Sequence, residues 1–403
     1  MSTKPSIVII GAGLGGLALA QGLAGAGLPV TVYERDADPV SRQQGYRISL
    51  NAMGMSALEA LLPVDRFVRL PEVEVAGVGE GFTFAGAGMR ALLSFPAESG
   101  ARTVRRAALR RHVAEGVPVV WGRRLTGLTA TGDGVEVRFA DGGRVHADLV
   151  VGADGAGSAV REAMRAAGAP VPDVVDLGIE SLGGHIDRTP EWDAWLPLNR
   201  GGAVQYLGPA GWSLFVSFCE RDDRTPTVLW ALSRRTGNGE PLGPSREDPV
   251  AAAADGMAHP AWHPTLRELV RRTPRTAVVP PLRFKASRYG SKPRVPLWRG
   301  GRVTLLGDAA HLMPPQRGLG GNSAFEDARV LVAALAGGGG VAHAVAAYER
   351  EMIPRSRRAV EESEEAAQMF HFRNPLAVTA RTAALRAAAA WRQAKGTRLT
   401  LSR

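Results

Sequence analysis

Cysteine is almost absent from this 403-residue sequence: Cys219 stands alone and has no partner for a disulfide within the chain. A scaffold held together by disulfides is therefore excluded, and nothing points to an oxidising compartment. Long apolar runs are also missing. The first run, 7–10, ends at Gly11 without a signal-peptide pattern, and no run approaches the about 20 residues of a membrane span. The expected location is the cytoplasm.

Lysine is scarce as well. It occurs at only four positions, so 45 of the 49 basic residues are arginine, and the net charge is +10. Because the arginines are spread from Arg35 to Arg403 rather than clustered with aromatic residues, nucleic-acid binding is not expected. No group of His and Cys residues has the spacing of metal ligands, and no Gly-x-Ser-x-Gly segment occurs. Neither a metal site nor a serine-hydrolase site is therefore expected.

What is present is the composition of a globular protein, with 45% hydrophobic and 22% charged residues. At roughly 100–200 residues per domain, the length allows several domains or two interleaved ones. The segment 174–284 differs from its surroundings. It has alternating strand patterns such as 212–218 and five of the eight tryptophans: Trp192, Trp195, Trp212, Trp230 and Trp262. A helical pattern is predicted at 51–62, two strands at 135–139 and 144–151 joined by the turn Asp141-Gly142-Gly143, and a loop at about 234–248. An Arg- and Ala-rich helical segment, about 375–395, closes the chain.

The N-terminal segment has the pattern of a strand, a glycine turn, a helix and a second strand. A β-branched run at 6–10 leads into Gly11-Ala12-Gly13-Leu14-Gly15-Gly16, and the second strand ends at Glu34, followed by Arg35. In such a unit the first glycine permits the tight turn, the second lets the backbone approach a pyrophosphate, and the third packs helix on strand. Glu34 stands where a carboxylate accepts hydrogen bonds from ribose hydroxyls. The pattern predicts a dinucleotide site without distinguishing NAD from FAD.

Two later segments narrow this prediction. In one, a strand runs into Gly152-Ala153-Asp154-Gly155 and then into a helix. The other runs from Gly307-Asp308 through Pro314-Pro315 and Gly318-Leu319-Gly320-Gly321-Asn322 into a helix at about 323–335. With all three motifs in this order and spacing, the sequence resembles the single-component FAD-dependent monooxygenases of the aromatic-hydroxylase type, which include tetracycline-inactivating members. The resemblance covers most of the chain.

The resemblance implies an FAD site, for which the residues offer physical reasons. The Asp308 carboxylate can accept a hydrogen bond from a ribityl hydroxyl, and the glycines of 318–321 leave N–H groups free for the flavin pyrimidine edge. Asp154 matches a segment implicated in FAD and NAD(P)H binding, although it could simply cap the next helix. The full cofactor set implied is Gly11, Gly13, Leu14, Gly15, Gly16, Glu34, Arg35, Arg47, Arg106, Asp154, Gly155, Asp308, Gly318, Gly320, Gly321 and Asn322.

The implied fold is α/β. A Rossmann-like FAD-binding domain would comprise 1–173 and 285–374, with an interleaved substrate-binding domain, 174–284, built on a mostly antiparallel β-sheet. The C-terminal helix, 375–403, would either brace the two domains or form a dimer contact, so a monomer and a homodimer both remain open. The expected substrate residues are Gln205, Trp212, Phe215, Met313 and Pro315. Alternation alone does not determine which strand residues face the pocket. Outside this sheet, His311 is expected to be a packing or hydrogen-bonding residue.

The implied activity is monooxygenation with NADPH or NADH and O₂ as co-substrates. NAD(P)H reduces FAD, the reduced flavin and O₂ form a C4a-hydroperoxide, and one oxygen atom passes to the substrate. Because the cofactor carries this chemistry, no catalytic side chain is predicted. An aromatic wall suits an aromatic or polycyclic small molecule, in natural-product tailoring or antibiotic modification. Two alternatives stay open: an FAD-dependent reductase of the same fold, and a non-catalytic flavin-containing binding protein.

Overall fold

The computed structural model describes residues 4–39, 47–75, 79, 81–236, 249–289 and 301–400. The chain divides into two compact units, each assembled from separate stretches. The first unit comprises Met1–Glu74, Gly100–Val175 and Lys285–Glu364, and the second comprises Val75–Ser99, Asp176–Phe284 and Glu365–Arg403. This division differs from the predicted boundaries at 75–99 and 365–374, which lie in the second unit. The C-terminal helix is part of that unit as well.

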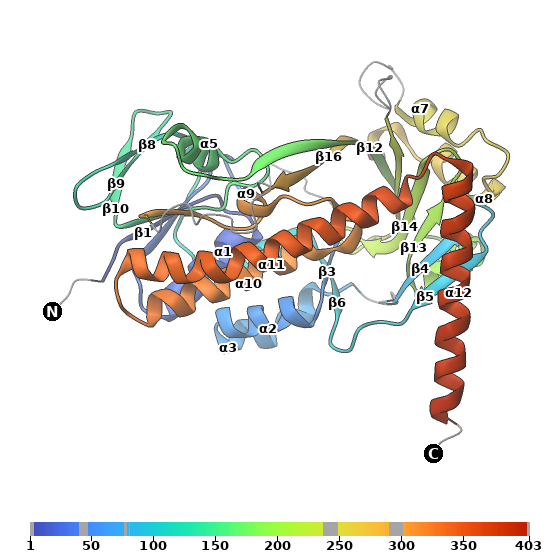
Figure 1. Ribbon diagram of the computed structural model, residues 1–403, viewed down its shortest axis with the longest axis horizontal. Coiled ribbons are helices and arrows are strands. Elements are labelled where there is room, and N and C mark those ends of the chain that lie inside the picture. The colour runs from blue at the N-terminus through green and yellow to red at the C-terminus, as the bar shows by residue number, and fades with distance from the viewer. Residues whose placement is uncertain are drawn as a thin grey trace. The chain divides into compact units, whose positions relative to one another are not determined.

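A parallel sheet lies at the centre of the first unit (Figure 1). Its strands are ordered β17 (Val303–Leu305), β11 (Leu149–Gly152), β1 (Ile7–Ile10), β2 (Val30–Tyr33) and β7 (Val119–Val120). All four residues of β1 are buried, as expected for a central parallel strand covered on both faces. The carboxyl ends of these strands meet at one edge, where a parallel α/β sheet binds its ligand.

Helix α1 (Leu14–Gly25) packs against α10 (Leu319–Ala336), and glycines on α1 permit their close approach. A Cβ at Gly15 would lie 3.0 Å from the Cβ of Ala324, and one at Gly22 would lie 2.8 Å from Val332. The two glycines are seven residues apart and so lie on one helix face. The other helices of this unit are α2 (Ala52–Leu61), α3 (Val64–Val68), η1 (Leu70–Val73), α4 (Arg106–Ala114), α5 (Ala159–Ala166), α9 (Asp308–His311), η4 (Pro315–Arg317) and most of α11 (Val341–Phe370).

Two small antiparallel sheets complete the first unit. One contains β10 (Arg144–Ala147), β9 (Val135–Phe139) and β8 (Leu125–Ala130), and the other pairs β3 (Arg47–Leu50) with β6 (Arg102–Arg105). The turn at 141–143 joins β9 to β10 as predicted. The single strand expected from Arg144 to Val151 is in fact two strands, because β10 joins the antiparallel sheet and β11 joins the parallel one.

The second unit is built on a large sheet with the order β16 (Val278–Arg288), β12 (Asp173–Asp187), β15 (Pro226–Arg235), β14 (Trp212–Glu220), β13 (Gly202–Leu207), β4 (Gly81–Gly86) and β5 (Ala91–Phe95). Its strands pair antiparallel at β12–β15, β15–β14, β14–β13 and β4–β5, while β13 and β4 are parallel. The remaining short elements are α6 (Pro190–Trp195), η2 (Pro197–Gly201), α7 (Pro249–Gly256), α8 (Pro264–Arg271) and η3 (Arg275–Ala277). Most of the loop predicted at 234–248 lies outside the described residues.

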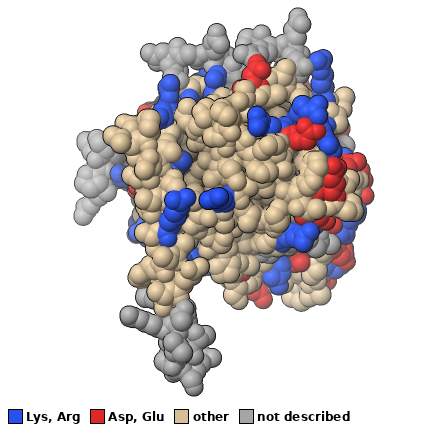
Figure 2. All heavy atoms as spheres, turned by 90° about the vertical axis from the view of Figure 1, so that its right-hand side faces the viewer, with Lys and Arg blue, Asp and Glu red and all other residues tan. Residues whose placement is uncertain are grey.

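Helix α12 (Pro375–Thr400) packs on β5 of its own unit. Leu385, Ala388 and Ala389 join a small apolar cluster with Leu92, Leu93 and Phe370. Figure 2 shows one face of the molecule, where uncharged surface occupies the centre and most acidic and basic side chains lie toward the edges. Within the described ranges, no helix combines the length and the apolarity needed to cross a membrane.

Candidate functional site

The turn between β1 and α1 uses its glycines for different purposes. Gly11 has φ +111°, and a Cβ there would lie 2.4 Å from the carbonyl oxygen of Ala153. A Cβ at Gly16 would lie 2.2 Å from the Gly11 carbonyl oxygen, so this glycine packs the helix against the strand. At Gly13 the nearest atom would be 3.9 Å away, which leaves the backbone open to a ligand. Leu14, the first residue of α1, is buried.

Glu34 follows β2 and holds this turn in place. Its carboxylate accepts hydrogen bonds from the N–H groups of Ala12, at 2.7 Å, and Asp36, at 3.0 Å. A carboxylate has about four acceptor positions, so Glu34 can still bind ribose hydroxyls. Arg35 beside it is half-buried. Sequence reasoning missed Arg110, which donates from Nε to the Ala12 carbonyl at 2.9 Å and lies 5.4 Å from the Trp121 ring.

Asp154 adopts the capping geometry that the sequence also allowed as its alternative role. Its carboxylate accepts hydrogen bonds from the Ser158 hydroxyl, at 2.5 Å, and from the Ala159 N–H, at 2.7 Å, at the start of α5. Burial is the largest influence on this carboxyl and raises its pKa, against the lowering effect of these hydrogen bonds. Gly155 beside it has φ +79°, and a Cβ there would have no atom within 4 Å, so its backbone is accessible.

A missed residue joins the Asp154 segment to the Asp308 segment. Arg161 on α5 is 3% exposed and donates hydrogen bonds to the carbonyls of Ala309, at 3.0 Å, and Ala156, at 2.7 Å. Its position three residues beyond Ser158 looked like an ordinary helix position in the sequence. The structure shows that it fixes the spacing of two predicted motifs.

Asp308 follows β17 and begins α9, in a recessed position. Water reaches its side chain. The protein atoms around the carboxylate nevertheless have the largest influence on its pKa and raise it. The charges of His311 and Arg106 oppose this rise. Arg106, the first residue of α4, has its pKa lowered by burial, while the Asp308 charge raises it. The fold therefore brings together two predicted cofactor residues that lie far apart in the sequence.

The glycine-rich loop is anchored by Asn322. This side chain is 1% exposed; it donates to the carbonyls of Ser49 and Gly318, each at 2.9 Å, and accepts from the Asn51 N–H at 3.0 Å. It therefore acts on the loop through the backbone. Gly318 has φ +63° and would have no atom within 4 Å of a Cβ, whereas a Cβ at Gly320 would lie 3.6 Å from the Asp308 carboxylate.

The remaining predicted residues of the first unit differ in accessibility. A Cβ at Gly321 would lie 2.4 Å from Ile48, so this glycine permits close packing. Arg47 on β3 donates to the hydroxyls of Ser49, at 2.9 Å, and Thr103, at 3.1 Å. Met313 is buried, with its sulfur 3.6 Å from the Ser363 hydroxyl, while Pro315 is exposed.

The register of the second sheet divides the predicted substrate residues between its two faces. Trp212 packs against the apolar cluster formed with α7 and α8, and a Cβ at Gly256 would lie 2.3 Å from its ring. Gln205 and Phe215 are direct cross-strand partners and point to the opposite face. The packing of Trp212 therefore argues against the substrate contact predicted for it, since its ring belongs to the core under the helices.

Sequence reasoning missed the contribution of β4 to the face that carries Gln205 and Phe215. Phe84 is paired with Gln205, and Phe82 precedes it by two residues on the same face, with the two rings 5.1 Å apart. Gln205 donates to the Ser213 hydroxyl at 2.5 Å. The alternation Phe82–Phe84 was visible in the sequence, but nothing there joined this strand to one that lies far along the chain.

The described residues fit a bound FAD. A glycine precedes each of the helices α1 and α10: Gly13 is the N-cap of α1 and Gly318 is the N-cap of α10. Neither N-terminus has a side-chain cap, so the first N–H groups are available to the phosphates and to the pyrimidine edge. Gly13, Gly155 and Gly318 leave backbone open in the same unit. Within the described ranges, no three His, Cys, Asp or Glu side chains are grouped to hold a metal ion.

Comparison with known proteins identifies the family. A family model described as an FAD binding domain matches residues 4–181 and 254–363, which is more than half of the chain. The chain therefore belongs to this FAD-binding family and is an FAD-dependent monooxygenase of the aromatic-hydroxylase type.

Three individual relatives illustrate the match. The chain is 30% identical to 6-hydroxynicotinate 3-monooxygenase of Bordetella bronchiseptica, covering 89% of this chain and 90% of the relative. It is 29% identical to the FAD-dependent monooxygenase thnD of Trichoderma harzianum, over 82% of each chain. The fold matches the crystal structure of Klebsiella pneumoniae HpxO with FAD and uric acid, with a TM-score of 0.77, 22% identity and coverage of 97% of this chain and 95% of that one.

Proposed function

We propose that this monooxygenase uses NADPH or NADH and O₂ to hydroxylate an aromatic or polycyclic small molecule. The observation that carries the proposal is the sheet face of the second unit, where the rings of Phe82, Phe84 and Phe215 accompany the amide of Gln205. Aromatic rings beside a few polar groups suit a planar substrate that carries a hydroxyl or a ring nitrogen. The 6-hydroxynicotinate 3-monooxygenase relative acts on a compound of this kind by its name.

The first unit supplies the cofactor contacts in this proposal. The open N-terminus of α1 binds the pyrophosphate, and that of α10 binds the pyrimidine edge of the flavin. Glu34 binds the ribose. Asp308 and Arg106 bind the flavin half of FAD, with Asp308 at the ribityl chain. Arg35, Arg47, Asp154 and Gly155 complete the set. When bound, FAD supplies electron transfer from NAD(P)H to O₂ and delivery of one oxygen atom. The protein binds, orients and excludes water.

The second unit supplies the substrate contacts. Phe215 and Phe82 provide apolar area, and Gln205 orients a polar substituent through its amide. Phe84 supports this face, because its ring packs against Phe370, 5.3 Å away, in the apolar cluster with α12. Pro315 of the exposed loop remains a candidate, whereas the burial of Met313 makes it a supporting residue. A natural-product tailoring step and the modification of an antibiotic both use substrates of this chemistry.

The test is consumption of NADPH and NADH, with O₂ uptake, by the purified flavoprotein in the presence of hydroxypyridines, phenols and polycyclic phenols. The proposal expects one compound class to stimulate both rates in equal amounts, with a product heavier by one oxygen atom. Anaerobic NAD(P)H consumption with a reduced organic product would establish the reductase alternative instead. Flavin that is never reduced by NAD(P)H would leave a flavin-containing binding protein.

A further inference from the structure

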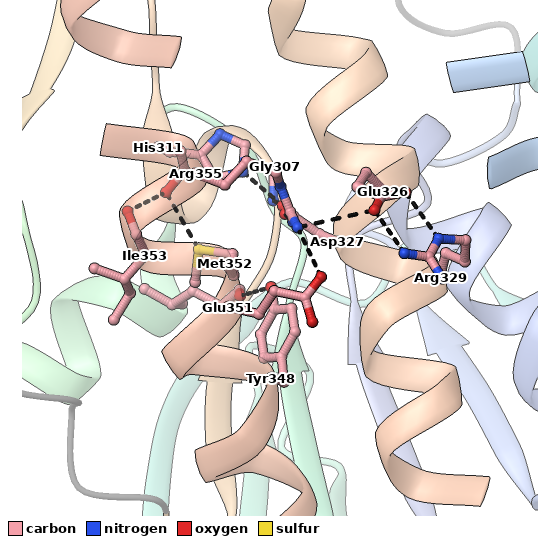
Figure 3. A network of polar contacts seen from close by, with 12 residues as sticks. Gly307, His311, Glu326, Asp327, Arg329, Tyr348, Glu351, Met352, Ile353 and Arg355 are labelled. Carbon is pink, nitrogen blue, oxygen red and sulfur yellow. Dashed lines mark hydrogen bonds and ion pairs between the residues drawn. The ribbon is translucent and has the colours of Figure 1, made fainter. Parts of the chain in front are cut away.

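A buried carboxylate on α10, Asp327, joins three elements of the first unit (Figure 3). Its side chain is 0% exposed. One oxygen accepts hydrogen bonds from the Gly307 N–H, at 3.1 Å, and from the His311 ring nitrogen Nε2, at 2.5 Å. The other oxygen accepts from Arg355 on α11, at 2.6 Å. The carboxylate is thus fully engaged, with two of its partners on a single short turn.

The two groups at the centre of this network, Asp327 and His311, are shielded from water, whereas Arg355 is partly exposed. Burial is the largest single influence and opposes ionisation of both His311 and Asp327. Their mutual attraction and hydrogen bond, together with Asp308 beside His311 and with Arg355 and the Gly307 N–H beside Asp327, outweigh it, so the pKa of His311 is raised and that of Asp327 is lowered. Arg355 adds a second cation, and its guanidinium also lies near Glu326, at 4.0 Å, and Glu351, at 3.5 Å. Breaking such a buried pair from one side leaves an uncompensated charge.

The two contacts on the turn lie on either side of Asp308. Gly307 directly precedes it, with φ +61°, and His311 follows one helical turn later at the end of α9. Holding the N–H before Asp308 and the ring after it fixes the backbone of the whole four-residue helix. Among the described residues, Arg106 and His311 act on the Asp308 carboxylate through their charges, so the direction of this carboxylate depends largely on the backbone that Asp327 holds.

We propose that Asp327 is a positioning residue for FAD, which holds Gly307 and His311 so that Asp308 presents its carboxylate to the cofactor. The inference rests on the proposed contact between Asp308 and FAD and does not depend on the substrate. A residue that holds a ligand-binding group in place contributes to the affinity for the ligand, because it determines how that group is oriented.

The test separates positioning from general stability by comparing Asp327→Asn with Arg355→Met. Both variants lose the ion pair between α10 and α11, so both are expected to unfold at a lower temperature in the FAD-free protein. Only Asp327→Asn also disturbs the hold on Gly307 and His311. We expect it to raise the FAD dissociation constant about tenfold or more, measured from flavin fluorescence released on dilution of the holoprotein. Arg355→Met should raise it far less.

Glu326→Gln is the matched control, because Glu326 neighbours Asp327 and pairs with Arg329 and Arg355 but contacts neither Gly307 nor His311. It should leave FAD affinity within about twofold of the parent. If Asp327→Asn does not fold, His311→Asn removes one of the two turn contacts and should still weaken FAD binding severalfold. Equal losses of FAD affinity in Asp327→Asn and Arg355→Met would overturn the proposal. Unchanged FAD affinity in a folded Asp327→Asn or His311→Asn protein would do the same.

Asp308→Asn distinguishes this proposal from the cofactor contact on which it rests. If Asp308→Asn binds FAD like the parent, the proposed contact itself is wrong. If Asp308→Asn loses FAD while Asp327→Asn retains it, only the positioning role fails.

Discussion

At the scale of single residues, the candidate site contains a carboxylate that water reaches but whose protein surroundings disfavour its charged form. This carboxylate is Asp308, because burial raises its pKa although Arg106 and His311 lie nearby. In the FAD-free protein this carboxylate is therefore a source of instability at neutral pH, of the kind expected at a site organised for a ligand. A group with a raised folded-state pKa favours folding below its unfolded pKa and opposes it as pH rises through the folded value.

Replacing Asp308 with Asn is accordingly expected to have opposite effects on stability and binding. The FAD-free variant should unfold at a higher temperature than the parent at pH 7, with the gain vanishing toward pH 4, because the penalty for the charged form is gone. Solvent at this exposed side chain keeps the gain small. FAD affinity should fall about tenfold or more. Differential scanning fluorimetry and flavin fluorescence measure the two effects. Glu98→Gln, at an exposed carboxylate, is the control. An Asp308→Asn protein that is destabilised at pH 7 and binds FAD normally would contradict the account.

The turn positions of the glycines in the candidate cofactor motifs could be predicted, because they follow from local turn chemistry. The partners of these motifs could not. Arg161 donates to the carbonyl of Ala309, far away in the chain, and no local pattern distinguishes it from an ordinary helix residue. Asn322 was predicted as a cofactor residue, but its contact with the Ser49 carbonyl was not. Asp154 shows a further limit, since its position in the sequence suits both a helix cap and a cofactor contact, and the structure displays the cap.

At the scale of elements, the β1–α1 turn contains two kinds of glycine. Some permit close packing of the backbone, and one, Gly13, leaves space for a ligand. Gly13→Ala adds a methyl group with no close neighbour, and Gly16→Ala places one 2.2 Å from the Gly11 carbonyl. We expect Gly13→Ala to keep the parent's FAD-free melting temperature while losing FAD affinity, because the methyl group occupies space that the pyrophosphate needs.

Gly16→Ala should instead lower the melting temperature before any cofactor is added, since the backbone of the turn has to shift. Gly25→Ala, at the open end of the same helix, is the control and should change neither property adversely. Thermal unfolding with and without FAD distinguishes these outcomes. A Gly13→Ala protein that binds FAD normally would show that the open backbone is not the phosphate site.

The two faces of the second sheet lead to a similar contrast. Trp212→Ala removes a ring packed under α7 and should cost about 2 kcal/mol or more of unfolding free energy, with the KM for substrate nearly unchanged. Phe215→Ala, on the opposite face, should raise that KM severalfold at a much smaller cost in stability. Thermal unfolding and steady-state kinetics measure both variants. A large KM effect from Trp212→Ala alone would reverse the assignment of the faces.

Element types were largely predictable from periodicity: the first βαβ unit, α2, β14, α10 and α12 all occur where their patterns indicated. The orientation of the sheet was not. The alternation along β14 does not show which face of the sheet is covered. Helices α7 and α8 cover the face that carries Trp212, and their packing there depends on the whole fold.

At the scale of the molecule, the chain passes between its two units more often than the amino-acid composition predicted. Strands β4 and β5 belong to the second unit although they lie within the N-terminal quarter of the sequence. Sequence analysis predicted an interleaved arrangement with one insertion, because only the tryptophan-rich stretch stood out. A short segment such as 75–99 carries no compositional mark, and its place is set by pairing with β13.

The second unit also contains a pH-sensitive group. His371 is 0% exposed, donates from Nδ1 to the Ala367 carbonyl and accepts from Ser233. Burial lowers its pKa to about 4, the Ala367 carbonyl opposes this, and the charges of Arg235 and Arg381 add to it. A histidine with a depressed folded-state pKa leaves the unfolded chain with more protons, so stability falls as pH decreases from about 6.5 toward 4.

We expect this histidine to contribute a loss of about 3 kcal/mol in unfolding free energy over that range. His371→Gln removes the titration, so denaturant unfolding at a series of pH values should show a shallower decline for the variant than for the parent. His343→Gln, at an exposed histidine on α11, is the control variant. Parallel curves for His371→Gln and the parent would contradict the assignment.

The central claim is that this protein transfers one atom of O₂ to an aromatic substrate. The most direct test is turnover with NAD(P)H under ¹⁸O₂, using the compound that best stimulates O₂ uptake, followed by mass spectrometry of the product. The account predicts one labelled oxygen atom on the aromatic product and none when the label is supplied as water. A product that lacks the label, or substrate consumed at the same rate without O₂, would contradict it.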